Sequence, residues 1–484
     1  MKNKKTTKHA LLSSLLAMFL SVVMLIGTTF AWFTDTASTA VNSIHSGTLD
    51  VDLEMQDDSG EWVTADGKTL EFKKAAGAEG EPVLWEPGST YVLPKLRVVN
   101  KGNLALKYNL VITGITGDAE LLEAIDFNYE GLGPDAEGIL LANETSPEIT
   151  ITGHMKETAG NEYQGMSIEG IAITVYATQA SHESDSYGKD YDEDAVNEEY
   201  EAYKVQRRFE ELVASGYKPA SSAADVAAGG KIVLANDVTT GSDFASNEDT
   251  ILDLNGNTLT AISDLEVHNG DLTMSNGTLL KTSSVGSIDI RPTENSADNV
   301  IKFENMNFIN TAEMSHIGPS SNSTLDMIEV HLRTATDLYI EFSDCYFENA
   351  KVIFEGFDAS NGTIYATFKN CHFNNFGNQD AIYARTYNNV NVEIDLIDCT
   401  FDLETTSNIA AIGTRTFTSP GYGYVKVKGS GNVLNAKPAV PTDIIKVFFT
   451  QSVKFVWLSS SKVDISELGP VTINKPEGFN ASLY

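Results

Sequence analysis

The stretch Ile340-Glu-Phe-Ser-Asp-Cys-Tyr-Phe347 carries the pattern that decides the fold of the C-terminal half of the chain. Apolar residues alternate with polar ones up to an Asn or Asp, after which a small or sulfur-bearing residue, one variable residue and an apolar residue follow. Related copies occur at Leu272–Leu279, Ile301–Phe308, Ala366–Phe373 and Ile394–Phe401. Their Asn or Asp stands at positions 276, 305, 344, 370 and 398, which gives steps of 29, 39, 26 and 28 residues.

Steps of this size with few helical segments predict one coil of a β-solenoid per repeat. Strands of successive coils pair about 4.8 Å apart, so equivalent side chains should stack into ladders. The Asn or Asp is expected at a bend, because these residues tolerate the left-handed backbone conformation. The aromatic residues two before and three after it should face inward. The longest step predicts a loop insertion around Ser315–Met327.

The three cysteines, Cys345, Cys371 and Cys399, occupy one position of the repeat. They are expected to be small, buried, apolar residues in one ladder, without redox chemistry. A disulfide would leave an odd thiol, and stacked parallel Cβ vectors suit such a bond poorly. The repeats resemble the right-handed parallel β-helix of the pectate-lyase-like superfamily over about residues 225–470. We therefore expect residues 222–484 to form a parallel β-helix domain.

Residues 1–31 have the organisation of a secretory signal peptide. A basic segment precedes the apolar run Leu11–Ile26, and small residues precede a predicted cleavage between Ala31 and Trp32. An uncleaved membrane anchor is the alternative, but the run is short for a span and contains serines. We expect cleavage and export, with no membrane span in the mature protein.

The chain is strongly acidic, with 33 Lys and Arg against 67 Asp and Glu and a formal net charge of −34. Removal of the signal peptide with its four lysines leaves 29 basic against 67 acidic residues, a net charge of −38. Such a surface repels phosphate backbones and anionic lipids, so nucleic-acid binding is excluded. Three cysteines without a Cys-x-x-Cys motif exclude a disulfide scaffold and a cysteine zinc site.

Residues 32–181 are predicted to form an antiparallel, jelly-roll-like β-sandwich, so the overall class is all-β. Residues of alternating polarity predict half-buried strands at Leu49–Met55, Leu106–Ile112 and Ile171–Ala177. Turns are expected at Trp85–Gly88 and Asn100–Asn103. A helix with an Asp cap is expected over Asp118–Asp126.

Three short elements stand near the predicted cleavage site: Ala31-Trp-Phe-Thr-Asp35, Asn42 and Ser46-Gly-Thr-Leu-Asp50. Together with Trp85–Ile112 they resemble the TasA and camelysin family, exported proteins of Gram-positive bacteria that are processed by the signal peptidase SipW. The alternative is an ordinary secreted protein whose first strand begins with the same residues. The resemblance covers about residues 20–181. It implies assembly into extracellular matrix fibres, in which an N-terminal segment can supply a strand to the neighbouring subunit.

Residues 182–221 are predicted to form an acidic, partly helical linker, with a helix from about Asp194 to Ser215. Carboxylates at 190, 192, 194 and 201 match positions 1, 3, 5 and 12 of a calcium loop, but Ala195 replaces the glycine that the sharp turn requires. A camelysin member carries a metallopeptidase label, yet no two of the eight histidines lie within ten residues of each other. No catalytic, cofactor or metal residue is therefore assigned.

Three functions are open at this point. A secreted cell-surface or biofilm-matrix protein with a structural or adhesive role is expected, with copies of itself or related matrix subunits as partners. A polysaccharide-binding protein that uses exposed Tyr and Phe is the alternative. A polysaccharide lyase or hydrolase is not expected, because such enzymes require clustered carboxylates with Arg or calcium. In the sequence the candidate residues stand isolated or lack a motif partner: Arg291, Arg333, Arg385, Arg415, Asp337 and Asp380.

Overall fold

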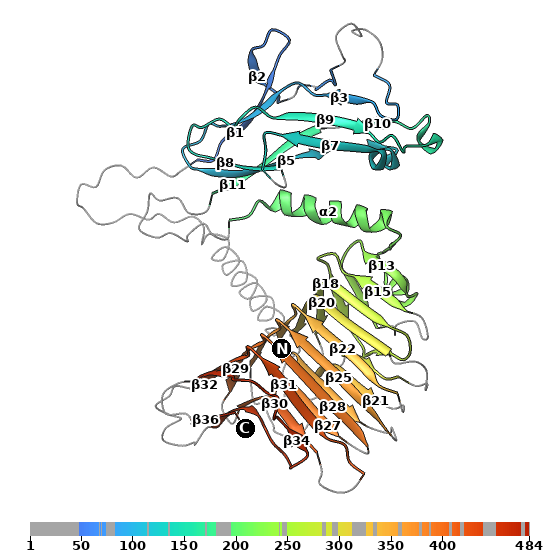
Figure 1. The fold of residues 1–484 in the computed structure, drawn as a ribbon, viewed down its shortest axis with the longest axis vertical. Helices are drawn as coiled ribbons and strands as arrows, with labels where there is room; N and C mark the ends of the chain where they lie inside the picture. Colours follow the sequence, from blue (N-terminus) through green and yellow to red (C-terminus); the bar gives the residue numbers. More distant parts are fainter. Residues whose placement is uncertain are drawn as a thin grey trace, which may run out of the picture. The chain divides into compact units, whose positions relative to one another are not determined.

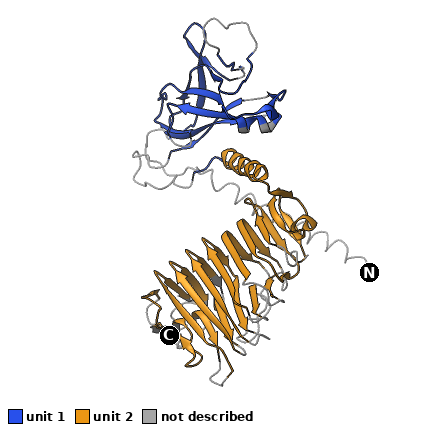
Figure 2. Cartoon of the chain, turned by 45° about the vertical axis from the view of Figure 1, so that its right-hand side comes forward, with its two compact units in different colours: residues 1–197 blue, residues 198–484 orange. Residues whose placement is uncertain are grey.

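The computed structural model divides the chain into two compact units, Met1–Asn197 and Glu198–Tyr484 (Figure 2). The structure describes residues 48–66, 68, 70–73, 83–113, 116–133, 136–169, 172–180, 195–241, 243, 249–282, 287–292, 299–311, 326–332, 336–356, 361–376, 380–386, 389–405, 409–416, 421–438, 452–475 and 480–483. Strands predominate in both units and helices are few (Figure 1), so the all-β class is confirmed. Each unit is described separately below.

Unit 1 consists of short antiparallel strands. They are β1 (Val51–Gln56), β2 (Trp62–Thr64), β3 (Thr90–Val92), β4 (Leu96–Asn100), β5 (Leu106–Thr113), β6 (Thr116–Gly117), β7 (Ile125–Glu130), β8 (Glu137–Leu140), β9 (Thr150–Met155), β10 (Ile168–Glu169) and β11 (Ala172–Gln179). Among the described residues they pair in the orders β2-β1-β4, β11-β5-β8, β3-β9-β7 and β10-β6. The alternation predicted for Leu106–Ile112 is confirmed in β5, whose first three apolar residues are buried.

One apolar core joins the three larger sheets of unit 1. It contains Leu96 and Val98 of β4, Leu106, Tyr108 and Leu110 of β5, Leu140 of β8 and Ile151 of β9. Burial of such side chains contributes about 1.5–3 kcal/mol each, which is what holds short strands together. The core therefore depends on residues that lie far apart in the sequence.

The connection Asn100–Asn103 contacts Thr48, at the start of the described chain, and joins it to this core. Asn100 is fully buried, and its Oδ1 accepts a hydrogen bond of 2.9 Å from the Gly102 amide. Asn103 Oδ1 accepts one of 2.6 Å from the Thr48 amide. A Cβ atom on Gly102 would lie 2.3 Å from the Thr48 carbonyl oxygen, so this close approach requires glycine. The turn expected here is confirmed, as is the turn at Gly88, where φ is +83°.

The predicted helix over Asp118–Asp126 is corrected by the structure. Ala119–Ala124 form a 3-10 helix, η1, and Ile125 already begins strand β7. The Asp118 side chain does not cap the helix but accepts a hydrogen bond of 2.9 Å from the Ser167 amide. Sequence periodicity cannot show that a distant backbone amide competes for this carboxylate. A second 3-10 helix, η3, spans Asn161–Tyr163.

Unit 2 begins with helices α2 (Glu198–Ala214) and α3 (Ala223–Ala227), and α2 confirms the helix expected near Asp194–Ser215. Its strands are β12 (Lys218–Ala220), β13 (Gly230–Leu234), β14 (Val238–Thr240), β15 (Thr250–Asp253), β16 (Thr258–Ala261), β17 (Leu265–Val267), β18 (Leu272–Lys281), β19 (Ile288–Ile290), β20 (Asn299–Asn310), β21 (Asp326–Leu332), β22 (Leu338–Ser343), β23 (Tyr346–Glu348), β24 (Lys351–Gly356), β25 (Gly362–Lys369), β26 (His372–Phe376), β27 (Ile382–Thr386), β28 (Val390–Ile397), β29 (Thr400–Thr405), β30 (Ile409–Arg415), β31 (Val425–Ser430), β32 (Val433–Pro438), β33 (Ser452–Val456), β34 (Val463–Asp464), β35 (Thr472–Asn474) and β36 (Asn480–Ser482).

These strands form two long parallel sheets. In the part of unit 2 that the structure describes, one sheet has 17 strands and runs from β12 to β35. The other has eight, in the order β17-β19-β21-β24-β27-β30-β33-β36. Most coils contribute two strands to the first sheet and one to the second. This arrangement fits the predicted β-helix-like fold.

The repeats identified in the sequence lie in register. Phe303 pairs with Phe342, Phe342 with Phe368, and Phe368 with Leu396. A second column contains Phe308, Phe347, Phe373 and Phe401, and all the aromatic rings in both columns are buried. The Phe342 and Phe368 rings stack with centroids 4.5 Å apart. The inward ladders predicted from the repeat are confirmed.

The bend positions adopt the predicted conformation. The Asn and Asp residues of the repeat have positive φ angles: Asn276 59°, Asn305 52°, Asp344 55°, Asn370 49° and Asp398 54°. Their side chains also bond between coils, since the Asn370 amide donates to Asp344 Oδ1 over 2.6 Å. In the next coil Gly431 takes this position with φ 73°. This coil was not among the repeats predicted from the sequence.

The three cysteines are buried and free of disulfide bonds, as predicted. Cys371 Sγ donates to the carbonyl of Phe342 over 3.5 Å, and Cys399 Sγ donates to that of Phe368 over 3.4 Å. Hydrogen bonds with Cys345 and Cys399, together with burial, raise the pKa of the Cys371 thiol. In the following coil Asn432 takes the place of the thiol, and its amide donates to the Leu396 carbonyl over 2.9 Å.

Helix α2 is fastened to the first coils of the β-helix. The Arg208 guanidinium forms a two-pronged ion pair with Asp253 and donates to Asn255 Oδ1 over 2.9 Å. The hydrogen bonds with Asp253 raise the pKa of Arg208. Because these contacts join α2 to strand β15 and its following turn, the helix belongs structurally to unit 2.

The loop insertion predicted around Ser315–Met327 falls mostly outside the described residues. Asp326 and Met327 are described, and there the prediction is wrong, because they begin strand β21. Met327 is fully buried in the core of the coils. Among the described residues, no helix combines the length and apolar character needed to cross a membrane.

Candidate functional site

The outer side of the eight-stranded sheet carries a set of charged residues that we call the polar face: Glu266, His268, Asp289, Arg291, Glu329, His331, Glu355 and Arg385. Ile288 and Ile290 are buried in the core, so Asp289 between them points to the other side of the sheet. The parallel register places Asp289 beside Glu266 on one coil and beside Glu329 on the next. A second column of side chains runs beside the first, because the register places His331 beside Glu355 and Glu355 beside Arg385.

Ion pairs join the polar face across the coils. Arg291 pairs with Asp289 and, over 2.9 Å, with Glu266. Arg385 pairs with Glu355 over 2.5 Å. The expectation that Arg291 and Arg385 stand isolated is therefore wrong. Their partners on the preceding coil cannot be identified from neighbouring sequence, because each coil places residues more than twenty positions apart side by side.

Burial and hydrogen bonding shift the pKa values of two carboxylates of this face, Asp289 and Glu329, in opposite directions. Burial raises the pKa of Asp289, although Arg291 and His331 partly oppose the change. Burial also acts to raise the pKa of Glu329, but hydrogen bonds with His331 and Ser287 outweigh it and the pKa is lowered. Glu329 is thus held ionised within a largely buried cluster.

Two groups on this face bring possible metal ligands together. In Asp243, Glu266 and His268, and again in Asp289, Glu329 and His331, the ligand atoms lie within 4.8 Å of one another. These residues were not predicted as metal ligands, because the histidines do not lie close together along the chain. A usable signal was present: Glu-Val-His occurs at both 266–268 and 329–331, and period-two spacing places Glu and His on one face of a strand.

The remaining candidates from the sequence have different surroundings. Asp337 accepts a hydrogen bond of 2.8 Å from the Thr363 amide of the next coil, which is a structural role. Burial raises the pKa of Asp380 to about 6, with Lys351 opposing the shift. Arg415 lies beside Arg385 in the register. Arg333 lies outside the described residues.

An aromatic stripe lies on the outer side of the 17-stranded sheet. Tyr339 and Tyr365 occupy successive coils, and their rings stack with centroids 5.0 Å apart and planes 11° apart. Tyr339 is 39% exposed and Tyr424 is 38% exposed. The Tyr424 hydroxyl donates to Glu393 over 2.6 Å, and this bond helps raise the tyrosine pKa to about 12. We call Tyr339, Tyr365, Glu393 and Tyr424 the tyrosine stripe.

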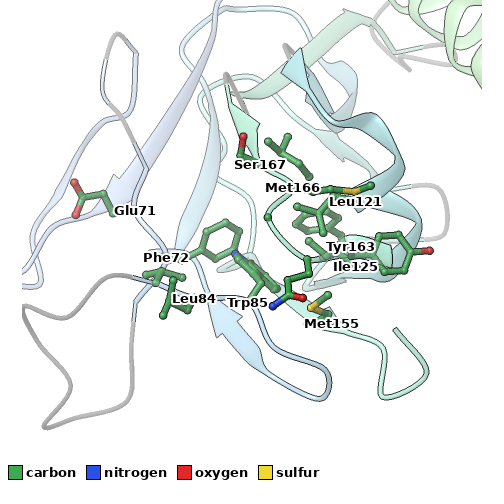
Figure 3. A pocket seen from close by; sticks show the side chains of 15 residues that line it. Glu71, Phe72, Leu84, Trp85, Leu121, Ile125, Met155, Tyr163, Met166 and Ser167 are labelled. Carbon is green, nitrogen blue, oxygen red and sulfur yellow. The ribbon is translucent and has the colours of Figure 1, made fainter. Parts of the chain in front are cut away.

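Unit 1 contains an apolar pocket of about 850 Å³ (Figure 3). Its lining includes Phe72, Trp85, Leu121, Met155 and Met166. The Phe72 and Trp85 rings meet edge to face with centroids 5.3 Å apart. These residues come from segments distant in the sequence, which is why periodicity alone did not indicate the pocket.

The predicted cleavage residues Ala31 and Trp32 lie outside the described residues. The same is true of Asp190, Asp192 and Asp194 of the calcium-loop match, so only Glu201, in helix α2, is placed. A comparison of the chain with protein-family models, with curated proteins and with solved structures finds no match in any of the three.

Proposed function

We propose that the chain is an exported cell-surface or biofilm-matrix protein with a structural or adhesive role. In this proposal unit 1 is a TasA-like or camelysin-like β-sandwich that assembles with other subunits, and unit 2 is a right-handed parallel β-helix that serves as an arm. The observation that carries the proposal is the stack of buried aromatic residues that runs through consecutive coils. Such a stack makes the β-helix rigid, so that the side chains on its outer surface keep fixed and regular positions.

The core of the coils supports this role on physical grounds. The rings of Phe347 and Phe373 stack at 4.3 Å, and those of Phe373 and Phe401 at 4.8 Å. Close-packed side chains resist deformation, because each loses its contacts when a neighbour moves. In unit 1, the bond between Thr48 and Asn103 joins two segments on which the family resemblance rests.

Electron microscopy of the secreted protein tests the structural role. We expect unbranched fibres from the mature chain and none when residues 32–46 are deleted. A variant in which Gly and Ser replace these residues at equal length controls for chain length. Mass spectrometry should give Trp32 as the first residue. Monomers of the intact mature chain under all conditions would contradict the assembly proposal.

The tyrosine stripe favours polysaccharide binding as a second function. Exposed aromatic rings offer flat apolar faces to sugars, while the adjacent carboxylate and hydroxyl groups supply hydrogen bonds. We expect Tyr339→Ala or Tyr365→Ala to weaken binding about three- to ten-fold, from the usual worth of an aromatic contact. Trp457→Ala is the matched control, because Trp457 is 41% exposed but follows β33 of the other sheet.

The proposal includes no catalytic step on the polysaccharide. Incubation of the mature protein with acidic and neutral polysaccharides should release neither reducing ends nor unsaturated sugars. Release of either product, lost on substitution of Asp289 or Glu329, would assign a lyase or hydrolase activity to the polar face instead.

A further inference from the structure

The group Asp289, Glu329 and His331 is built into the β-helix by its register. Asp289 stands on β19 and Glu329 directly beside it on β21. His331 follows two residues after Glu329 on the same strand, so both side chains leave the same face. Backbone pairing therefore holds all three ligands on rigid elements rather than on loops, which is the arrangement that gives a preorganised site.

The distances within this group match those between ligands of one metal ion. His331 Nε2 lies 3.3 Å from Glu329 Oε2 and 3.7 Å from Asp289 Oδ1. Zinc bonds to nitrogen and oxygen of about 2.0–2.2 Å place tetrahedral ligand atoms about 3.3–3.6 Å apart. The 3.3 Å contact is also a hydrogen bond, so His331 and Glu329 hold each other in place.

One oxygen of the group points to a missing partner. Asp289 is 1% exposed, and its Oδ2 is engaged by Arg291. Among the residues that the structure describes, buried Oδ1 has no hydrogen-bond partner. Buried polar atoms nearly always have one, because an unpaired carboxylate oxygen in a dry environment is costly. Oδ1 is also the atom that lies 3.7 Å from the histidine nitrogen.

The charge around the group favours a cation. Glu266 and Asp289 pair with Arg291, and Glu355 pairs with Arg385. Glu329 lies beside His331 instead, so four carboxylates meet two guanidiniums and the imidazoles of His268 and His331. A histidine that binds a metal ion is neutral, so in the metal-bound state the four carboxylates and two guanidiniums leave two excess negative charges on this largely buried face. A divalent cation would balance them.

We propose that Asp289, Glu329 and His331 bind one divalent cation of the zinc type. A nitrogen and two carboxylate oxygens form a mixed donor set that suits Zn²⁺, whereas Ca²⁺ and Mg²⁺ prefer oxygen alone. Three protein ligands leave one tetrahedral position for water or another ligand. This site goes beyond the proposed structural role and does not depend on it.

The surrounding residues suit this assignment. Arg291 orients Asp289 from the side opposite the ligand oxygen. Glu355 lies 3.9 Å from His331 Nδ1, and Arg385 holds Glu355 in place. At this distance Glu355 forms no hydrogen bond with the second ring nitrogen and acts on the ring through its negative charge, which favours a cation at the first nitrogen.

The test measures zinc in the mature secreted protein. After equilibration with Zn²⁺ and removal of free metal, mass spectrometry of the elements should find about one zinc per chain. Asp289→Asn, Glu329→Gln and His331→Gln should each weaken binding more than the ten- to hundred-fold typical of a lost supporting residue. His268→Gln in the neighbouring group and His372→Gln on the other sheet should leave the affinity unchanged.

Three results would overturn the proposal: no zinc retained by the parent protein, equal retention by the His331→Gln variant, or loss of zinc through His268→Gln. Circular dichroism without metal establishes that each variant is folded. If a variant does not fold, Co²⁺ in the parent protein decides the question. Intense visible bands of a four-coordinate site support the proposal, and weak six-coordinate bands or no binding contradict it.

Discussion

The rings of Phe347 and Phe373 stack with centroids 4.3 Å apart and planes 7° apart, although the residues belong to different coils. Strand pairing of β23 with β26 holds the two backbones in register. Each ring therefore fills the space above its neighbour, and the loss of one leaves a cavity that the paired backbones cannot close. This relationship determines which substitutions unit 2 tolerates.

Replacement of Phe368 by Ala should lower the stability of unit 2 by about 3–5 kcal/mol, the usual cost of truncating a buried Phe. Phe368 is fully buried between Phe342 and Leu396. Lys369→Ala is the control, because this outward side chain forms a surface ion pair with Glu341, and such pairs are worth about 0–1 kcal/mol. Urea unfolding measures both. Equal stability of the two variants would show that the column is not packed as described.

The thiols of Cys345, Cys371 and Cys399 should resist labelling in the native protein. All three are buried. The raised pKa of Cys371 also keeps its thiol protonated, and the thiolate is the reactive form. Labelling kinetics with and without denaturant check this. Rapid native modification of Cys371 would contradict the ladder position assigned to it.

The effect of a substitution at Asn370 on stability should depend on whether the new residue tolerates a left-handed backbone conformation. Its φ of 49° is left-handed, so Asn370→Gly should be nearly neutral while Asn370→Val should cost about 1–3 kcal/mol. The Asn370→Gly variant also loses the bond to Asp344, so the difference between the two variants isolates the backbone effect. Thermal unfolding measures it. A valine variant as stable as the glycine variant would be the contrary result.

Asp380 should make stability decrease as pH rises from about 4 to 6. Its folded pKa of about 6 exceeds its ordinary value, because burial disfavours the charged form. The native state therefore keeps a proton that the unfolded state has released, and each pH step in this window favours unfolding. Asp380→Asn should flatten the profile and stabilise the protein at pH 8 by on the order of 2 kcal/mol. Urea unfolding at pH 4, 6 and 8 measures the difference.

Limited proteolysis should cut within residues 181–197 and spare helix α2. The sequence predicts a linker over residues 182–221, but Arg208 anchors α2 to Asp253 in unit 2. Arg208→Ala removes charge-assisted hydrogen bonds worth about 1.5–3 kcal/mol and should extend cleavage into the helix. Arg207→Ala is the neighbouring control, because Arg207 forms its ion pair with Glu211 of the same helix. An unchanged cleavage pattern in Arg208→Ala would contradict the anchor.

The repeat of unit 2 was predictable from sequence because its physical requirements are local. A bend needs a residue that tolerates positive φ, and a buried strand needs alternating apolar residues, so Asn305 and Phe308 indicate their roles by spacing alone. The coil that contains Gly431 was missed because its glycines replace both the Asn and the Phe of the pattern.

The polar face was decided only by the tertiary structure. Nothing near Asp289 in sequence shows that Glu329 lies beside it, because the intervening chain leaves the sheet and returns. The same holds for Arg385 and Glu355, which parallel pairing brings together. Local sequence determines where strands and bends form, since it sets backbone preference and side-chain polarity. The register between coils determines which charges meet, because only pairing and packing over the whole core select one alignment.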